Sequence, residues 1–371
     1  MPRQFTEQEV IERIEDMRRR RPRFVDEHIT MSHGSGGKAS RQLVEGLIVP
    51  ALENPALAVL GDAAMVAVPT TADGSGDPAS SVHLAFTTDS FVVQPLRFPG
   101  GSIGELAVNG TVNDLAVSGA RPLWLSAALI LEEGLDAAVL SGEVDAIARA
   151  ASEAGVTVVT GDTKVVQRGK ADGLYITTSG VGARATVAAL APEFVRPGDK
   201  VLVSGTIGDH GVAIMLARGE LDIDADVRSD TRSLWPVVSA VLDACGEAVH
   251  CMRDATRGGV ATVLNEIALT TRLGVVIDEQ RLPLRPEVVG AGEILGIDPI
   301  YVANEGKLLA FVAPDHADAA LTAMRSHPSS EDAAVIGEVR DEPEGRVLGR
   351  TTFGGHRMID MLVGDPLPRI C

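Results

Sequence analysis

The segment VHLAFTTDSFVVQPLRFPGGSIGELAVNGTVNDLAVSGA, residues 82–120, contains an apolar stretch, a turn and a second apolar stretch with a different period. Its β-branched and aromatic first part predicts a strand that ends near Asp89, and residues 102–119 predict a helix. Glu105, Asn109 and Asn113 are spaced four apart, which places them on one face of that helix. Polar groups at a strand end and on an adjoining helix make this segment the starting point for both fold and site.

The same alternation continues on both sides of this segment. Strands are predicted in LAVLGDAAMVAV (57–68), VTVVTGDTKVV (156–166) and LYITTSGVGA (174–183), and a further helix over 134–153. A second block begins near residue 194 and contains the apolar segments KVLVSG, GVVIDE, KLLAFVA and AAVIGEV. Mixed strands and helices in two blocks predict a two-domain α+β protein, with the seam at Pro197 and Gly198.

We therefore divide the chain into four parts: an extension with an amphipathic helix (1–29), an N-terminal domain (30–188), a C-terminal domain (189–363) and a tail (364–371). The tail, GDPLPRIC, contains two prolines and should be extended and mobile. The turn-rich stretch 71–80 is predicted to be a loop insertion.

Composition excludes several classes of protein. The chain has 371 residues and a net charge of −18, which disfavours nucleic acid as the main partner. Its longest apolar run, LWLSAALIL at 123–131, is too short to cross a bilayer. Three cysteines and an acidic N-terminus without a signal peptide indicate a cytoplasmic protein with reduced thiols.

Two features point to a nucleotide with a divalent cation. In HGSGGK (33–38), Gly34, Ser35, Gly36 and Gly37 precede a predicted helix, where unpaired N–H groups bind anions. Asp62, Asp89 and Asp162 are each predicted to follow an apolar strand, and with Asn113 they offer the oxygen ligands that Mg²⁺ prefers. A structural turn, or loop caps and solvated edges, would explain the same residues one at a time.

Other motifs are ambiguous from their residues alone. RDATRGG (253–259) fits either an anion site or a plain helix cap by Asp254 or Thr256, and ANEGK (303–307) offers Glu305 as a base or as a surface partner of Lys307. The roles of Asp209 and His210 in IGDHG are likewise undecided between a functional and a structural one. Cys245 and Cys251 are predicted to be packing thiols. Cys371 differs because it is the last residue, at the end of the predicted tail.

Taken in order, these motifs resemble those of the HypE family of hydrogenase maturation factors. HypE proteins are carbamoyl dehydratases of the PurM-like superfamily, which includes aminoimidazole ribonucleotide synthetase and selenophosphate synthetase. The resemblance covers residues 29–371 and rests on HGSGG, the segment 87–120, TGDTKVV, GDHG, RDATRGG, ANEGK and the terminal PRIC. One departure is Gly61 before Asp62, where relatives often carry a second acid.

The resemblance implies an activity and a set of residues. A partner carbamoyltransferase, HypF, would load a carbamoyl group onto Cys371, and ATP would drive its dehydration to a thiocyanate, the cyanide source for nickel-iron hydrogenase. Lys164 and Glu305 would orient the carboxamide and accept protons. The ligands of ATP and Mg²⁺ would be Gly34, Ser35, Gly36, Gly37, Asp62, Asp89, Asn113, Asp162 and Thr163, with Asp62, Asp89, Asn113 and Asp162 on the metal.

The resemblance further implies a homodimer whose N-terminal sheets pair into a barrel, and a HypC–HypD complex that receives the cyanide. Two other functions fit parts of the same pattern. Another ATP-dependent PurM-like enzyme, such as a selenophosphate synthetase or a thiamine phosphate kinase, would not need a terminal thiol. A non-catalytic carrier would use the thiol without turnover.

Overall fold

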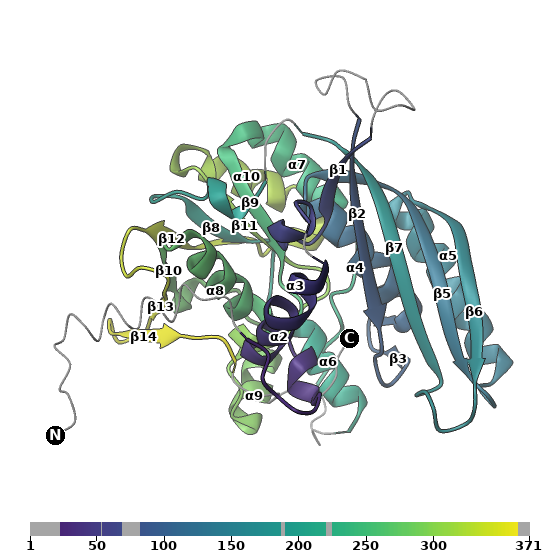
Figure 1. The fold of residues 1–371 in the computed structure, drawn as a ribbon. Helices are drawn as coiled ribbons and strands as arrows, with labels where there is room; N and C mark the ends of the chain where they lie inside the picture. The colour runs from purple at the N-terminus through teal and green to yellow at the C-terminus, as the bar shows by residue number, and fades with distance from the viewer. Residues whose placement is uncertain (1–22, 53, 69–81, 187–189, 220–224, 363–371) are drawn as a thin grey trace, which may run out of the picture.

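The computed structural model describes residues 23–52, 54–68, 82–186, 190–219 and 225–362. Two β-sheets lie side by side, one built from the first half of the chain and one from the second (Figure 1). The predicted helix within 1–29, the insertion 71–80 and the tail with Cys371 lie outside the described residues. Within the described part, no helix has the length and apolar character needed to cross a membrane.

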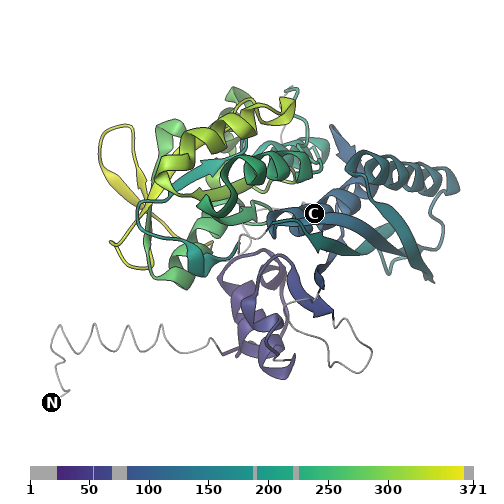
Figure 2. The ribbon, with the colours of Figure 1, turned by 90° about the horizontal axis from the view of Figure 1, so that it is seen from above.

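The N-terminal sheet has the strand order β1-β2-β7-β5-β6. Its strands are β1 (Ala64–Val68), β2 (Val82–Phe91), β5 (Ala120–Glu132), β6 (Thr157–Val166) and β7 (Leu174–Arg184). Helices α4 (Ile103–Val117) and α5 (Ala137–Ala154) lie against one face (Figure 2). Because α4 packs against the sheet, α5 and the C-terminal domain, nearly all of its residues are buried. The opposite face of the sheet carries no described helix.

The C-terminal sheet has the order β14-β13-β10-β12-β8-β11-β9. Its strands are β8 (Lys200–Val203), β9 (Val249–Asp254), β10 (Gly274–Asp278), β11 (Leu308–Val312), β12 (Ala334–Arg340), β13 (Val347–Arg350) and β14 (His356–Ile359). Alternate residues of a strand face opposite sides. Val201 and Val203 therefore pack with α8 (Gly259–Thr271), while Leu202 packs with α7 (Trp235–Cys245) and α10 (Ala317–Arg325).

Shorter elements connect the sheets. The glycine-rich motif leads into α2 (Lys38–Leu43), the π-helix η2 (Val44–Ile48) and α3 (Val49–Leu52), which lie in front of both sheets in Figure 1. The remaining helices are α6 (Asp209–Ala217) and α9 (Pro286–Leu295). The other short elements are η1 (Met31–Gly34), η3 (Leu57–Val59), β3 (Arg97–Phe98), β4 (Gly101–Ser102), η5 (Pro192–Phe194), η6 (Gly246–Ala248), η7 (Glu279–Arg281), η8 (Pro299–Tyr301), η9 (Pro314–His316) and η10 (Pro328–Ser330).

Most predicted strands and helices are present, but two local expectations were wrong. Asp62 precedes β1 instead of ending a strand, because the apolar residues before it form η3 and a turn at Leu60 with φ 51°. The helix after RDATRGG is capped by Gly258 with φ 75°, not by Asp254 or Thr256. Only a residue without Cβ adopts that left-handed conformation at low cost.

Candidate functional site

Three carboxylates meet where the two domains touch, and we call them the acid cluster: Asp62, Asp114 and Asp254. One oxygen of each lies within 4.8 Å of the others. Asp62 comes from the turn before β1, Asp114 from the C-terminal half of α4 and Asp254 from the end of β9. The cluster therefore exists only when both domains are folded and docked.

Burial and mutual repulsion make the acid cluster unfavourable without a cation. The pKa of Asp114 is raised well above its usual value, first by burial and then by the charges of Asp254, Asp62 and Asp89. Burial, followed by repulsion from Asp62, raises the pKa of Asp254 to about 8. Hard divalent cations bind carboxylate oxygens and remove this repulsion. The donor set therefore fits Mg²⁺.

Arg253 fixes one member of the cluster. Its Nε lies 3.1 Å from Oδ1 of Asp62, and its Nη2 donates to Oε2 of Glu266 at 3.2 Å. Arg253 precedes Asp254 on β9, so the same strand supplies one carboxylate and the cation that holds another.

Asp89, on β2, lies close enough to add its charge to Asp114, Asp254 and Glu305. Burial raises its own pKa, and the charge of Arg257 opposes that shift. Arg257 also donates from Nη1 to the backbone oxygen of Gly34 at 3.0 Å. This arginine therefore connects the glycine-rich motif to the carboxylates.

The glycines of HGSGGK allow close approach to the C-terminal domain. Gly36 has φ 79°, and a Cβ there would lie 2.9 Å from the backbone oxygen of Arg257. A Cβ on Gly37 would lie 2.6 Å from the oxygen of Leu362, which accepts a hydrogen bond from the Lys38 N–H at 3.3 Å. The motif thus lies against the last described residue before the tail.

Glu305 is buried, with 3 % of its surface exposed. Burial, together with the charges of Asp89, Asp230 and Asp254, raises its pKa well above the usual value. Its backbone is held on both sides: the N–H donates to Oδ1 of Asp230 at 3.0 Å, and the carbonyl accepts from Nδ2 of Asn113 at 3.1 Å.

The alternative that Glu305 pairs with Lys307 at the surface is wrong. Lys307 is buried and its Nζ lies 3.0 Å from Oδ2 of Asp230. Asp209 and His210 are buried as well, and His210 bonds Ser229 through Nδ1 at 2.8 Å. Cys245 and Cys251 are free and buried thiols, as expected for packing residues.

Asn113 has its side chain in backbone contacts. Its Nδ2 donates to the oxygens of Arg232 and Glu305, and its Oδ1 accepts from the Leu234 N–H at 2.7 Å. The next residue, Asp114, is the one that joins the acid cluster. The helix face predicted from Glu105, Asn109 and Asn113 therefore lies one position away from the carboxylate of Asp114.

Asp162, Thr163 and Lys164 lie on β6, the edge strand farthest from β1. Asp162 is 62 % exposed and pairs with Lys164 at 2.7 Å. Register places Asp162 beside Ala128, on the same face of the sheet as Trp124. Within this single chain they are not brought to the acid cluster.

Sequence reasoning missed Asp114, Asp254, Arg253 and Asp230 as members of the site. Asp254 could have been found, because VHCMRD ends an apolar strand with an acid in the same way as the segments used for Asp89. Asp230 gives no such signal, since it lies in a loop between α6 and α7 and only the fold brings it to Lys307.

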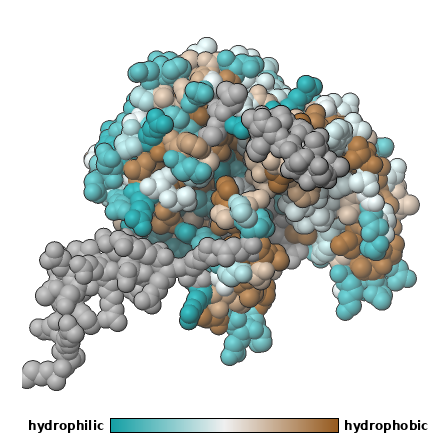
Figure 3. Space-filling view, turned by 45° about the horizontal axis from the view of Figure 1, so that its top comes forward, coloured by the Kyte–Doolittle hydropathy of each residue, from teal (hydrophilic) through white to brown (hydrophobic). Residues whose placement is uncertain are grey.

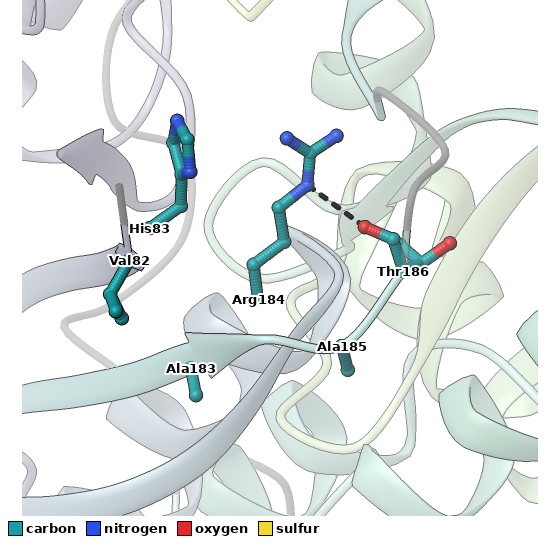
Figure 4. Close-up of a pocket in the computed structure, with 6 residues that line it drawn as sticks. All are labelled: Val82, His83, Ala183, Arg184, Ala185 and Thr186. Carbon is teal, nitrogen blue, oxygen red and sulfur yellow. Dashed lines mark hydrogen bonds between the residues drawn. The ribbon is translucent and has the colours of Figure 1, made fainter. Parts of the chain in front are cut away.

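Two surface hollows are candidates for a ligand site. One, of about 540 Å³, lies between α2, η3 and α8 and is bordered by Gly36, Gly37 and Arg253. The other, of about 510 Å³, is lined by Val82, His83, Ala183, Arg184, Ala185 and Thr186 (Figure 4). There Nε of Arg184 donates to the oxygen of Thr186 at 2.8 Å. The described lining of the second hollow includes no carboxylate, whereas that of the first includes Glu266 and Arg253, the partner of Asp62. The first hollow therefore adjoins the acid cluster and is the better candidate for a small-molecule site.

Comparison with known proteins identifies the family to which both domains belong. Residues 61–183 match the N-terminal domain, and residues 196–350 the C-terminal domain, of AIR synthase related proteins. Carbamoyl dehydratase HypE of Rhodobacter capsulatus is 51 % identical over 349 residues, which cover 93 % of this chain and 99 % of the relative. The chain belongs to the HypE family. The expected two-domain PurM-like fold is thereby confirmed.

Two solved HypE structures are similar over most of their length. One is a HypE with ATP: its TM-score is 0.75 and its identity 44 %, over 93 % of this chain and 100 % of that one. The other is a HypE–HypF complex, with a TM-score of 0.79 and 43 % identity, covering 86 % of this chain and 99 % of that chain.

Proposed function

We propose that this HypE-family chain uses ATP to dehydrate a carbamoyl group carried on the thiol of Cys371, giving a thiocyanate. The observation that carries the proposal is the junction of three parts: the acid cluster, the glycine-rich motif and the root of the tail. Arg257 donates to Gly34 of the motif and acts on the charge of Asp89, which in turn acts on Asp114 and Asp254, and the Lys38–Leu362 hydrogen bond connects the motif to the root of the tail. The relative solved with ATP supports ATP as the nucleotide of this chain.

Mg²⁺ would be held by Asp62, Asp114 and Asp254, with Asp89 near enough to contribute. When bound it neutralises phosphate charge in a chain whose net charge would otherwise repel ATP. The hollow of about 540 Å³ beside Gly36 and Gly37 has the volume of a small-molecule site. Gly34, Ser35, Gly36 and Gly37 are assigned to the phosphates.

The dehydration has simple requirements. The carbamoyl oxygen is a poor leaving group, so ATP phosphorylates it and it departs as phosphate. The carbon–nitrogen bond becomes a triple bond as two N–H protons leave, and a base must accept them. Glu305 is assigned as that base, since its side chain is buried beside the acids and its backbone is clamped by Asn113 and Asp230.

The tail has the reach that this chemistry needs. Nine residues follow Leu362, and they span at most about 30 Å when extended. Leu362 already contacts the glycine-rich motif, so Cys371 can reach the nucleotide without rearrangement of the two domains. Cys251 does not compete for modification, because burial raises its pKa to about 12.

A second copy of the chain gives a role to Lys164, Thr163 and Asp162. The uncovered face of the N-terminal sheet is apolar, with a row formed by Phe86, Val181 and Trp124. Brown residues gather over this sheet in Figure 3, and Val82, Phe86 and Trp124 are 56 %, 49 % and 47 % exposed. Large exposed apolar patches mark interfaces. Pairing of two such sheets in a homodimer would cover this face, and β6 of each subunit would bring Lys164 toward the other.

The partners follow from the family. HypF supplies the carbamoyl group, and the relative solved as a HypE–HypF complex supports HypF as a binding partner. A HypC–HypD complex receives the cyanide for nickel-iron hydrogenase, and the reaction takes place in the cytoplasm.

Mass spectrometry of the intact chain tests the proposal. After incubation with HypF, carbamoyl phosphate and Mg-ATP, the adduct on Cys371 should lose the mass of one water. With a non-hydrolysable ATP analogue it should remain at the carbamoyl mass. If the adduct keeps the carbamoyl mass with Mg-ATP as well, the chain is a carrier and the proposed dehydration is wrong.

A further inference from the structure

One half of the C-terminal sheet is open on the side away from α8. On that side, α7 and α10 form a hydrophobic core with sheet residues such as Leu202, Leu308 and Ala310. Among the described residues, no side chain of β10, β13 or β14 belongs to this core. We call the exposed surface of β12, β10, β13 and β14, with the adjoining Lys200 and Arg281, the open half-sheet. Its residues are Lys200, Val276, Asp278, Arg281, Val335, Glu338, Arg340, Leu348, Arg350, His356 and Met358.

Strand register shows that these side chains share one face. Lys200 pairs with Glu338, Glu338 with Val276, Val276 with Leu348 and Leu348 with Met358, across five strands. Residues directly opposite in a sheet point to the same side. The centre of the open half-sheet is therefore apolar. Val276 there is buried, Leu348 is half-buried, and Met358 at the edge is 56 % exposed.

Cations surround this apolar centre. Glu338 lies between Lys200 at 2.8 Å and Arg340 at 2.7 Å. Asp278 lies between Arg350 at 2.6 Å and Arg281 at 3.6 Å. Two acids thus face four cations, which leaves two positive charges in excess on a chain whose net charge is −18.

The surface is hollow and its cations are accessible. A depression of about 310 Å³ includes Lys200, Arg281, Arg340, Arg350 and His356 in its lining. The side chains of Arg340 and Arg350 are 53 % and 54 % exposed. Exposed ion pairs contribute little to folding stability, so the fold itself does not account for this concentration of arginines. Arginine and apolar side chains around a hollow are typical of binding interfaces.

The open half-sheet adjoins the root of the tail. β14 carries His356 and Met358 and ends at Ile359, and only three described residues separate it from the nine that end in Cys371. A protein that modifies this thiol must place its active site within about 30 Å of Leu362. Docking beside the root would raise its effective concentration at the thiol.

We propose that the open half-sheet is the docking surface for the carbamoyl-donor protein, and that it receives an acidic segment of that protein with at least one apolar side chain. The proposal rests on the proposed function, because it takes Cys371 as the group that is modified. Excess positive charge matches the acids of the segment, and the half-buried Leu348 and the exposed Met358 accommodate its apolar residue.

The test compares the full-length chain with the double variant Arg340→Glu/Arg350→Glu. The matched control is Arg149→Glu/Arg228→Glu, which reverses two arginines that are 58 % and 71 % exposed and that also pair with acids. Affinity for purified HypF is measured by calorimetry at two salt concentrations. Carbamoylation of Cys371 is followed by mass spectrometry over a range of HypF concentrations.

We expect the double variant to bind HypF at least tenfold more weakly, with a smaller dependence on salt, while the control binds like the parent chain. Carbamoylation should need more HypF but reach the same maximal rate, and ATP binding should not change. A second variant, Met358→Ala, should weaken binding severalfold without altering charge.

Equal HypF affinity of the parent chain and the double variant would overturn the proposal. Equal affinity with a change in oligomeric state, seen by sedimentation, would assign the surface to a second copy of the chain instead. Failure of the parent chain to bind HypF or to be carbamoylated would overturn the proposed function too. Normal carbamoylation by the double variant at every HypF concentration rejects only the docking surface.

Discussion

Nδ2 of Asn113 lies 3.1 Å from the backbone oxygen of Glu305, and this hydrogen bond joins α4 of the N-terminal domain to the ANEGK loop of the C-terminal domain. Asp230 holds the other side of the same residue through its N–H. The position of the proposed base is therefore set by contacts from two separate segments, one in each domain.

Asn113→Ala should lower the free energy of unfolding by about 3 kcal/mol, because it leaves buried backbone groups of Leu234 and Glu305 without partners. Denaturant unfolding measures this. Asn109→Ala is the control, since it removes one 3.2 Å bond to Thr231 from the same helix. A variant that is fully stable but has lost Mg²⁺ affinity would instead support the metal-ligand role predicted for Asn113.

Asp254→Asn should weaken Mg²⁺ binding at least about tenfold, because it removes a charged oxygen ligand from the acid cluster. Calorimetry with Mg²⁺ and ATP measures this. Asp226→Asn, at a position whose side chain is 83 % exposed, should change nothing. If Asp162→Asn matches the loss seen with Asp254→Asn, then β6 of a partner subunit completes the metal site.

Stability of the metal-free chain should fall as pH rises from about 4 to 8. Folding raises the pKa of Asp254 from its ordinary value of 3.8 to about 8. Between these two pH values the folded state therefore binds more protons than the unfolded state. Thermal unfolding across this range measures the slope. Saturating Mg²⁺, or Asp254→Asn, should flatten it, and an unchanged slope with Mg²⁺ would place the cation elsewhere.

Gly36→Ala should impair ATP binding more than Gly34→Ala does. A Cβ at Gly36 would collide with the backbone of Arg257 at a φ of 79°, while a Cβ at Gly34 meets no atom within 4 Å. Nucleotide titration of both variants provides the measurement, with thermal unfolding to confirm that each is folded. Equal ATP affinity of the two variants would show that the close approach of Gly36 to Arg257 is dispensable.

Glu305→Gln should bind Mg-ATP normally and accept the carbamoyl group, yet lose dehydration. A glutamine has nearly the same shape but cannot take up a proton. In the parent chain the dehydration rate should rise with pH, since burial and neighbouring acids raise the pKa of Glu305 and the base must be ionised. Loss of water from the adduct at the normal rate in Glu305→Gln would remove Glu305 from this role.

Local sequence was sufficient for the strands, for α4 and α5, and for the family, because these depend on periodicity and on motifs read in order. It also identified Asp62, Asp89 and Glu305 as polar groups next to apolar segments. It could not distinguish Asn113 from Asp114, since adjacent helical residues point about 100° apart and only the packing of α4 decides which one meets the other domain.

The sequence by itself determined the elements, the glycines that permit close approach, and the thiol at the end of the chain. Only the tertiary structure decided that Asp254 joins Asp62 and Asp114, and that Lys307 pairs with Asp230 and not with Glu305. It also decided that β14 places a basic surface beside the root of the tail. These relationships join residues far apart in the chain, and no local pattern records a contact that the docking of two domains creates.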